Sequence, residues 1–159
     1  MSPEYLAGFF DGEGCIDVQR VACRAKGYEN RLYVRPRVRV AQAAVGVRVL
    51  QELQGRFGGH LCFRKSRKAT QSDSYSLEFL SEGDVKNILD TMLPSLIVKR
   101  EQAKLVLGWY SQFKGLQTHL DAGIDQVRHI FKEELAVMKR GPQRLSEEAL
   151  QRMHAAMMR

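Results

Sequence analysis

The 159-residue chain is long enough to bury one hydrophobic core, and we expect a single domain over residues 1–159. With 44% hydrophobic residues the composition excludes a disordered chain, and no apolar run approaches the roughly 18 residues that a membrane span needs. The formal net charge is +7, with 25 basic against 18 acidic residues. This excess favours a polyanionic partner, most commonly nucleic acid, although a solvated basic surface is the alternative.

The cysteine content and the start of the chain indicate the compartment. The chain has three cysteines, which is an odd number without a CxxC spacing: Cys15, Cys23 and Cys62. We interpret them as reduced thiols and exclude a disulfide framework or a zinc site. Acidic residues at Glu4, Asp11 and Glu13 interrupt the first apolar stretch, which excludes a signal peptide. We therefore expect a soluble intracellular protein in a reducing compartment.

The first predicted element is a helix. Ser2 and Pro3 form a helix start, with a hydroxyl cap followed by proline at the first helical position. The helix continues through Leu6, Phe9 and Phe10, which we expect in the core, and ends near the glycines at 12 and 14. From residue 15 the apolar residues alternate with polar ones, which predicts a strand.

The clearest strand covers residues 33–40. Every second residue is apolar or proline, and the residues between them are Tyr33, Arg35, Arg37 and Arg39. Because side chains alternate across a strand, the basic residues share one face. Pro36 within this strand predicts an edge position or a bulge.

The remaining elements follow in a regular order. We predict a helix over 45–57, a strand through 61–63, a strand over 74–79 with Ser74, Ser76 and Glu78 outward, and a Ser81-capped helix that ends before Pro94. Further helices are predicted over 98–113 and 121–138, and a last one capped by Ser146. The fold class is α+β: an αββαββα core with one antiparallel sheet and additional C-terminal helices.

One segment of the first helix carries a family resemblance. Residues 5–16, Tyr-Leu-Ala-Gly-Phe-Phe-Asp-Gly-Glu-Gly-Cys-Ile, are similar to the LAGLIDADG motif of homing endonucleases. The motif lies where that family has it, on the first helix leading into the first strand. The αββαββα order also matches, so the resemblance covers essentially the whole chain and implies a saddle-shaped sheet.

The motif also has a physical logic. Gly8 and Gly12 lie on one helical face, and small residues allow two helices to approach until their backbones touch. In the family, a chain with one motif forms a homodimer through this helix, and the motif occurs once here. The resemblance therefore implies a homodimer that binds a partly palindromic DNA target. The expected interface residues are Ala7, Gly8, Asp11 and Gly12.

The resemblance also assigns the catalytic residues. Glu13 sits at a helix C-terminus, which is a poor place for a carboxylate unless a cation joins it; a solvated turn glutamate is the alternative. By resemblance, Glu13 and the carbonyl of Gly12 hold Mg²⁺ or another divalent cation such as Mn²⁺. Gln42 and Lys99 match family residues that act on water and on the scissile phosphate, although each alone also fits a surface residue. A second basic residue of some relatives falls on Gly46 here, with Arg48 as the nearest candidate.

The basic face of the sheet is the expected DNA contact. A two-stranded ribbon fits the major groove, and arginine pairs with guanine. The candidates for reading bases are Arg35, Arg37 and Arg39, and then Tyr33, Gln19, Asp17, Arg64, Ser74, Ser76 and Glu78. The candidates for phosphate contacts are Lys26, Arg31, Lys65, Arg67 and Lys68.

The sequence thus predicts a metal-dependent, site-specific homing endonuclease that cuts double-stranded DNA, of the kind associated with intron homing, with no membrane or small-molecule cofactor. Two alternatives share this fold: an RNA-splicing maturase and a DNA-binding regulator without cleavage. Loss of the metal-binding acid or the basic pocket would favour the regulator, and both are present. An unrelated basic regulator or ribosomal protein is the outside alternative. The histidines show no metal-ligand spacing and receive no catalytic role: His60, His119, His129 and His154.

Overall fold

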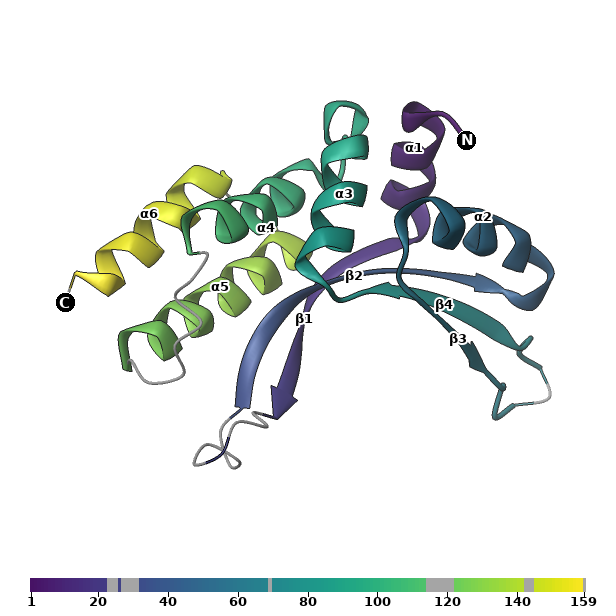
Figure 1. The fold of residues 1–159 in the computed structure, drawn as a ribbon, viewed down its shortest axis with the longest axis horizontal. Helices are drawn as coiled ribbons and strands as arrows, with labels where there is room; N and C mark the ends of the chain where they lie inside the picture. The colour runs from purple at the N-terminus through teal and green to yellow at the C-terminus, as the bar shows by residue number, and fades with distance from the viewer. Residues whose placement is uncertain (23–25, 27–31, 69, 114–121, 142–144, 159) are drawn as a thin grey trace. The chain divides into compact units, whose positions relative to one another are not determined.

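The computed structural model describes residues 1–22, 26, 32–68, 70–113, 122–141 and 145–158, with the side chains of 32–34 and 122–123 left out. The predicted α+β element order is confirmed (Figure 1). No helix in the described part of the chain is both long and apolar enough to cross a membrane. The elements are α1 (Pro3–Glu13), β1 (Gly14–Ala22), β2 (Leu32–Ala43), η1 (Ala44–Gly46), α2 (Val47–Phe57), β3 (His60–Arg64), β4 (Ser74–Phe79), α3 (Glu82–Met92), η2 (Leu93–Ser95), α4 (Arg100–Gln112), α5 (Ala122–Arg140) and α6 (Ser146–Met157).

The chain divides into two compact units. Unit 1 consists of Met1–Ile16 and Arg37–Val98, and unit 2 of Asp17–Pro36 and Lys99–Arg159. The expectation of one domain over 1–159 stays a prediction.

Helix α1 begins as the sequence predicts. The Ser2 hydroxyl accepts a hydrogen bond from the amide of Tyr5 at 3.3 Å, and Pro3 opens the first turn. Leu6 and Phe10 are fully buried, as expected, but Phe9 is only half-buried. Phe9 is therefore not a core residue, because its ring stacks on the exposed Tyr5 along the outer side of the helix.

The change from α1 to β1 depends on a glycine. A Cβ atom at Gly14 would lie 2.3 Å from the ring of Phe10. Any side chain at this position would push the buried phenylalanine out of place. Glycine therefore allows the strand to start directly over the last turn of the helix.

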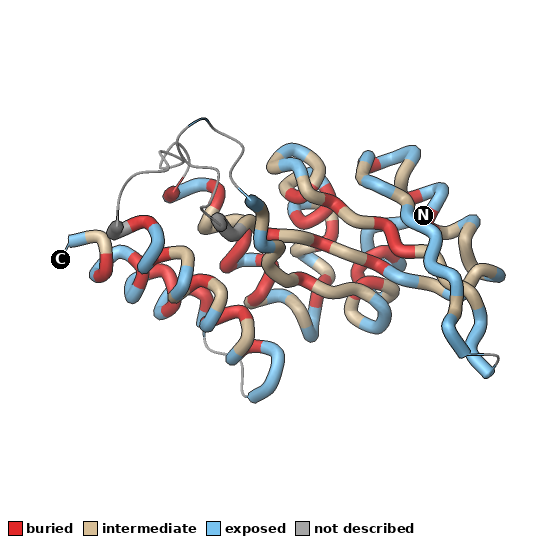
Figure 2. The backbone as a smooth tube through the Cα atoms, turned by 90° about the horizontal axis from the view of Figure 1, so that it is seen from below, coloured by how far each residue is buried: buried red, intermediate tan, exposed pale blue. Residues whose placement is uncertain are grey.

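The four strands form one sheet in the order β1-β2-β4-β3. In unit 1, β2 and β4 are antiparallel, and Val38 pairs with Phe79 and Val40 with Leu77. These four residues are fully buried, and α1, α2 and α3 lie on their side of the strands (Figure 1). Seen from below, buried and half-buried segments alternate along the strands (Figure 2), as the period of two requires.

Pro36 occupies a different place from the one expected. Strand β2 is an inner strand, so an edge strand is the wrong description. However, the pairing with β4 begins only at Val38, where β4 ends at Phe79. Pro36 lies beyond the end of β4, so its missing N–H removes no hydrogen bond to that strand.

Unit 2 contains three helices that pack on one another, α4, α5 and α6. Buried residues of α4 and α5 include Val106, Val127 and Leu135, and the rings of Trp109 and Phe131 lie 4.5 Å apart. This apolar packing confirms the helical interpretation of the C-terminal third.

The predicted cap of the last helix is wrong. Leu145, not Ser146, is the cap residue of α6, and Ser146 is its first helical residue and is buried. The amide and the hydroxyl of Ser146 both donate to Glu101 Oε2, at 3.0 and 3.1 Å. Burial opposes ionisation of Glu101, but these bonds and the ammonium of Lys104 hold the pKa of its carboxyl below the usual value.

Candidate functional site

The motif ends in an exposed carboxylate. Glu13 is the last residue of α1, where the helix leaves its final carbonyl groups without amide partners. Its side chain makes no hydrogen bond or ion pair with any residue that the structure describes. The negative end of the helix dipole disfavours a carboxylate at this position unless a cation joins it.

Asp11, two residues earlier, has a different environment. One oxygen of its carboxylate accepts the amide hydrogens of Ile97 and Val98, at 2.8 and 3.1 Å. These bonds join the end of α1 to the segment that follows η2. Sequence analysis assigned Asp11 only an interface role, because an interaction over 86 residues leaves no local signal.

The outer side of α1 combines two aromatic rings with two glycines. Tyr5 and Phe9 stack with ring centroids 6.4 Å apart, and Gly8 and Gly12 are exposed on the same side. A Cβ atom at either glycine would meet nothing within 4 Å. Ala7, by contrast, is fully buried within its own chain and has no exposed surface that a second chain could contact.

Gln42 lies near the end of β2 and is half-buried. It pairs with Tyr75 of β4, so it faces the same side as Val40 and not the side of the arginines. A Cβ atom at Gly46 would lie 3.2 Å from Gln42 Oε1, so the Gln42 amide borders the place of the missing second basic residue. Arg48 is exposed on α2.

Lys99 is the cap residue of α4 and is half-buried. It follows Val98 directly in the chain and is the first residue of its segment in unit 2. Its catalytic role, like those of Glu13 and Gln42, stays a prediction.

The strands of unit 1 present a polar face opposite the helices. We call it the reading face. Strand β2 contributes Arg37 and Arg39 to it, and the cross-strand register adds residues of β4 and β3. Sequence reasoning missed four members: Ala41 and Ala43 at the end of β2, and two residues of β3, which was identified only from Leu61 and Phe63. The reading face comprises Arg37, Arg39, Ala41, Ala43, Ser74, Ser76, Glu78, His60, Cys62 and Arg64.

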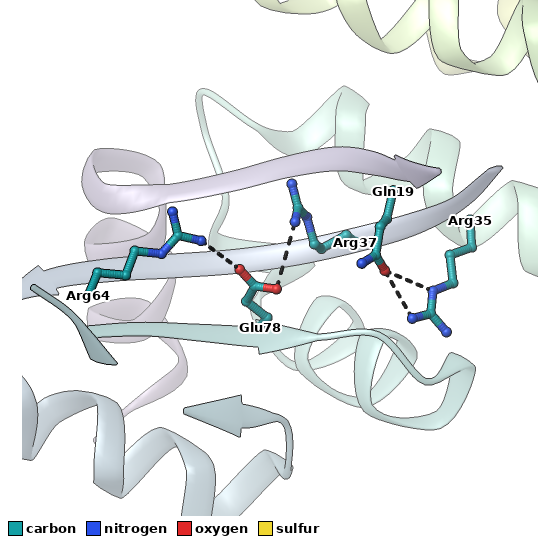
Figure 3. Close-up of polar contacts among 5 residues, drawn as sticks. All are labelled: Gln19, Arg35, Arg37, Arg64 and Glu78. Carbon is teal, nitrogen blue, oxygen red and sulfur yellow. Dashed lines mark hydrogen bonds and ion pairs between the residues drawn. The ribbon is translucent and has the colours of Figure 1, made fainter. Parts of the chain in front are cut away.

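The centre of the reading face holds an ion cluster. Glu78 Oε1 lies 3.2 Å from an Arg64 nitrogen, and Glu78 Oε2 lies 3.7 Å from an Arg37 nitrogen (Figure 3). The Glu78 side chain is only 12% exposed, whereas that of Arg64 is 56% exposed. Each carboxylate oxygen therefore engages a different arginine, and both arginines are among those expected to read bases.

Arg35, the candidate for reading bases that lies in unit 2, also has a partner. Arg35 donates from Nε and from one terminal nitrogen to Gln19 Oε1, at 3.1 and 2.9 Å (Figure 3). Both residues are half-buried, as is Asp17, and Lys26 is exposed. Arg31 and the side chain of Tyr33 lie outside the described residues.

Ser76 departs from its expected exposed position. It belongs to the reading face, yet it is only 2% exposed, and its hydroxyl has no hydrogen-bond partner among the described residues. The register explains this burial. Arg64 stands opposite Ser74 and Glu78 opposite His60, so their ion pair passes over Ser76.

The turn after β3 builds a basic depression of about 930 Å³. The Asp73 carboxylate accepts the amide hydrogen of Ser66 at 2.8 Å, and the Asp73 carbonyl accepts that of Ala44. These bonds hold the turn against the end of β2. The depression is lined by four basic residues, Arg64, Lys65, Arg67 and Lys68, together with Ala43 and Ser74.

The structure also bears on a metal site. Among the described residues of one chain, no group of three His, Cys, Asp or Glu side chains could hold a metal ion. Glu13 therefore does not belong to such a site within a single chain. Its hard carboxylate oxygens are nonetheless the kind of donor that Mg²⁺ and Mn²⁺ bind.

Comparison with known proteins identifies the family. The sequence model of the family described as LAGLIDADG endonuclease matches residues 6–94, more than half of the chain. A search of curated protein sequences found no match.

Solved structures share the fold. The homing endonuclease I-CvuI, in complex with its target in the presence of calcium, is 24% identical, with a TM-score of 0.68 over 97% of this chain and 93% of that chain. The archaeal intron-encoded homing endonuclease I-Vdi141I, complexed with DNA, is 19% identical, with a TM-score of 0.58 over 99% of this chain and 97% of that one. The meganuclease I-CpaMI, bound to uncleaved DNA, is 16% identical, with a TM-score of 0.63 over 98% of this chain and 50% of that chain.

The family match spans the motif helix, the reading face and the basic depression. The chain accordingly belongs to the LAGLIDADG endonuclease family of DNA-cleaving enzymes.

Proposed function

We propose that the protein is a site-specific endonuclease that cuts both strands of a partly palindromic DNA target as a homodimer and depends on a divalent cation. The observation that carries the proposal is Glu13, an exposed carboxylate at the end of the motif helix without a partner among the described residues. Such a group is stabilised by a cation, and it lies next to a helix face that is open to a second chain.

The dimer follows from the same helix. Tyr5, Phe9 and the two exposed glycines form a face on which another helix can approach closely. In a symmetric dimer through this face, each Glu13 would approach its symmetry mate, which would supply a second carboxylate. The two chains would then present two reading faces to two half-sites.

The donor set fits a hard divalent cation. Two Glu13 carboxylates with backbone carbonyls of Gly12 are oxygen ligands, which Mg²⁺ prefers. When bound, such an ion supplies Lewis-acid stabilisation of charge at the scissile phosphate. Gln42 would orient water through its amide, and Lys99 would offer positive charge to the phosphate.

DNA recognition would divide between the reading face and the depression. Arginines of a strand pair can read guanine in the major groove, and the lysines and arginines of the turn can contact phosphates. I-CvuI, which shares the fold, was crystallised in complex with its target. The four basic residues that line the depression of about 930 Å³ support phosphate contacts by this turn.

The test is cleavage of a randomised, partly palindromic duplex library by the wild-type protein and by Glu13→Gln, with Mg²⁺ and with EDTA. Glu4→Gln is the matched control, because it removes the same charge from an exposed position at the other end of α1. We expect Glu13→Gln to lose at least roughly 100-fold in cleavage rate while it still binds the selected duplex. Glu4→Gln should cut like the wild type.

Two outcomes would overturn the proposal. Selective binding without cutting by any of the proteins would favour a regulator or a maturase on this fold. Equal cutting by Glu13→Gln and the wild type, or cutting that persists in EDTA, would remove Glu13 and the cation from the mechanism.

A further inference from the structure

The ion cluster of the reading face is unusual for a surface that meets a polyanion. Glu78 places a carboxylate at its centre, on β4 between β2 and β3. A negative charge there repels phosphates and lowers the positive potential of the face. The structure shows what this charge does in the protein without DNA: it engages Arg37 and Arg64 at the same time.

We propose that Glu78 sets sequence discrimination by competing with DNA for Arg37 and Arg64. In the unbound protein its carboxylate holds both guanidinium groups. A correctly placed base edge displaces the carboxylate, and random duplex does not. This inference rests on the proposed function, because it requires that the reading face contacts DNA.

The geometry suits a competitor better than a direct contact. Both oxygens of Glu78 are engaged and the side chain is only 12% exposed, so it has little surface left to offer a base. A bidentate guanine edge offers an arginine two acceptors, as a carboxylate does. An isolated phosphate contact can be made by any lysine of the nearby turn and does not require Arg37 or Arg64 to be released.

The cluster is also able to open. The Arg64 side chain is 56% exposed, so its ion pair with Glu78 is open to solvent on one side. The Arg37 side chain is only 19% exposed, but it lies 3.7 Å from Glu78, which is a long separation for an ion pair. An ion pair that is open to solvent contributes little to stability and can exchange partners. A tightly buried pair would instead be a fixed part of the core.

Ser76 supplies a second, independent observation. Its hydroxyl is buried on the reading face without a hydrogen-bond partner among the described residues, and the register places Ser76 between Glu78 and the residue opposite Arg64. A buried hydroxyl without a partner is costly, so each such group in a native protein needs an explanation. When Arg64 leaves Glu78, the Ser76 hydroxyl becomes available to a base edge or to a bridging water.

The test compares affinities for the selected target and for a random duplex of the same length, for the wild type and for Glu78→Gln, at several salt concentrations. The glutamine keeps the shape and removes the charge. We expect binding to random duplex to tighten by roughly tenfold, because the negative charge at the centre of the reading face is removed and Arg64 is released toward phosphates, and its salt dependence to steepen by one to two phosphate contacts. Binding to the selected target should change by less than about threefold, so the specificity ratio falls several-fold.

Glu52→Gln is the matched control. It removes the same charge from unit 1, at a residue of α2 that pairs with the chain's first amino group and lies outside the reading face. We expect its specificity ratio to equal that of the wild type. An equal gain in random-duplex affinity for Glu52→Gln and Glu78→Gln would reduce the effect to net charge and overturn the inference.

A double-variant cycle covers the case in which Glu78→Gln perturbs the strands. Arg64→Gln leaves Glu78 with one partner and should weaken binding to both duplexes several-fold. The Arg64→Gln, Glu78→Gln pair should restore binding to the random duplex. A parallel loss on both duplexes in Glu78→Gln, or no recovery in the pair, would show a structural role only.

The outcomes also separate this inference from the function. If the wild type selects no target from any duplex library, the proposed function fails. If the wild type selects and cuts a target but Glu78→Gln keeps its specificity ratio, only the inference fails. A loss confined to the selected target, with an unchanged salt dependence, would make Glu78 a direct base contact and would also overturn it.

Discussion

The carboxylate at the end of α1 and the carboxylate at the centre of the reading face have opposite environments. Glu13 is exposed and has no partner among the described residues, whereas Glu78 is mostly buried between two arginines. Both lie on surfaces that we assign to the same DNA. Under the proposed function, the carboxylate charge is balanced by arginines on the surface that would read bases, and is left unbalanced at the position that would bind a cation.

The first prediction concerns the exposed face of α1, which we propose is covered by a second chain in the dimer. Gly8→Leu adds a bulky side chain to the exposed side of α1, where a Cβ atom meets nothing in this chain. We expect the dimer dissociation constant to rise by roughly 100-fold or more, because overpacking costs about 1–3 kcal/mol at each of two symmetry-related positions. Sedimentation equilibrium measures this constant, and cleavage should be lost with the dimer.

Gly55→Leu is the control for that change. Gly55 is an exposed helical glycine of α2 with the same open space around its Cβ position. Its replacement should leave both the assembly and the cleavage unchanged. A Gly8→Leu protein that remains dimeric and active would place the interface elsewhere.

The second prediction concerns the stability of the connection between α1 and β1, where we expect a smaller effect. Gly14→Ala would bring a methyl group to within 2.3 Å of the Phe10 ring. We expect the free energy of unfolding to fall by about 1–3 kcal/mol, as measured by urea denaturation.

Gly12→Ala on the same helix provides the contrast. Its Cβ position is open, so alanine should raise the stability of the monomer by up to about 1 kcal/mol. Equal stability changes for the two variants would mean that Phe10 moves aside without cost.

The third prediction concerns the carboxylate of Glu101, where we expect the smallest change in stability. Hydrogen bonds from Ser146 and Lys104 outweigh burial and lower the pKa of Glu101 from 4.5. A lowered folded-state pKa stabilises the protein above the unfolded-state value, and this contribution is lost as the pH falls through the lowered pKa. Glu101→Gln should therefore reduce the free energy of unfolding at neutral pH by about 1 kcal/mol.

The pH series is the measurement for this variant. The difference between Glu101→Gln and the wild type should shrink as the pH falls below 4.5. Glu148→Gln, at an exposed position in the first turn of α6, should show no such dependence. A difference that stays constant down to acid pH would assign the effect to packing and not to charge.

The parts of the fold that depend on neighbouring residues could be predicted from the sequence. The Ser2 and Pro3 helix start and the alternation along β2 are local patterns, and the structure confirms them. The motif predicted the family for the same reason, because its residues are consecutive.

The errors and omissions concern side chains whose partners lie elsewhere in the sequence. Ser76 alternates like an exposed residue, and its burial depends on the path of the Arg64 side chain. Ser146 has the sequence of a cap, but Glu101 engages it across 45 residues. Asp11 bonds over 86 residues in the same way. No window of local sequence contains these pairs.

The bond from Asp11 to Ile97 and Val98 has a consequence for how the protein is made. Asp11 is translated early, but the amides that its carboxylate accepts follow 86 and 87 residues later. Because so long a loop must close before this contact forms, the end of α1 acquires its native environment late in folding. A nascent chain from which Val98 has not yet emerged therefore carries the complete motif without these two hydrogen bonds. Synthesis must continue well past the motif before the chain can become a nuclease.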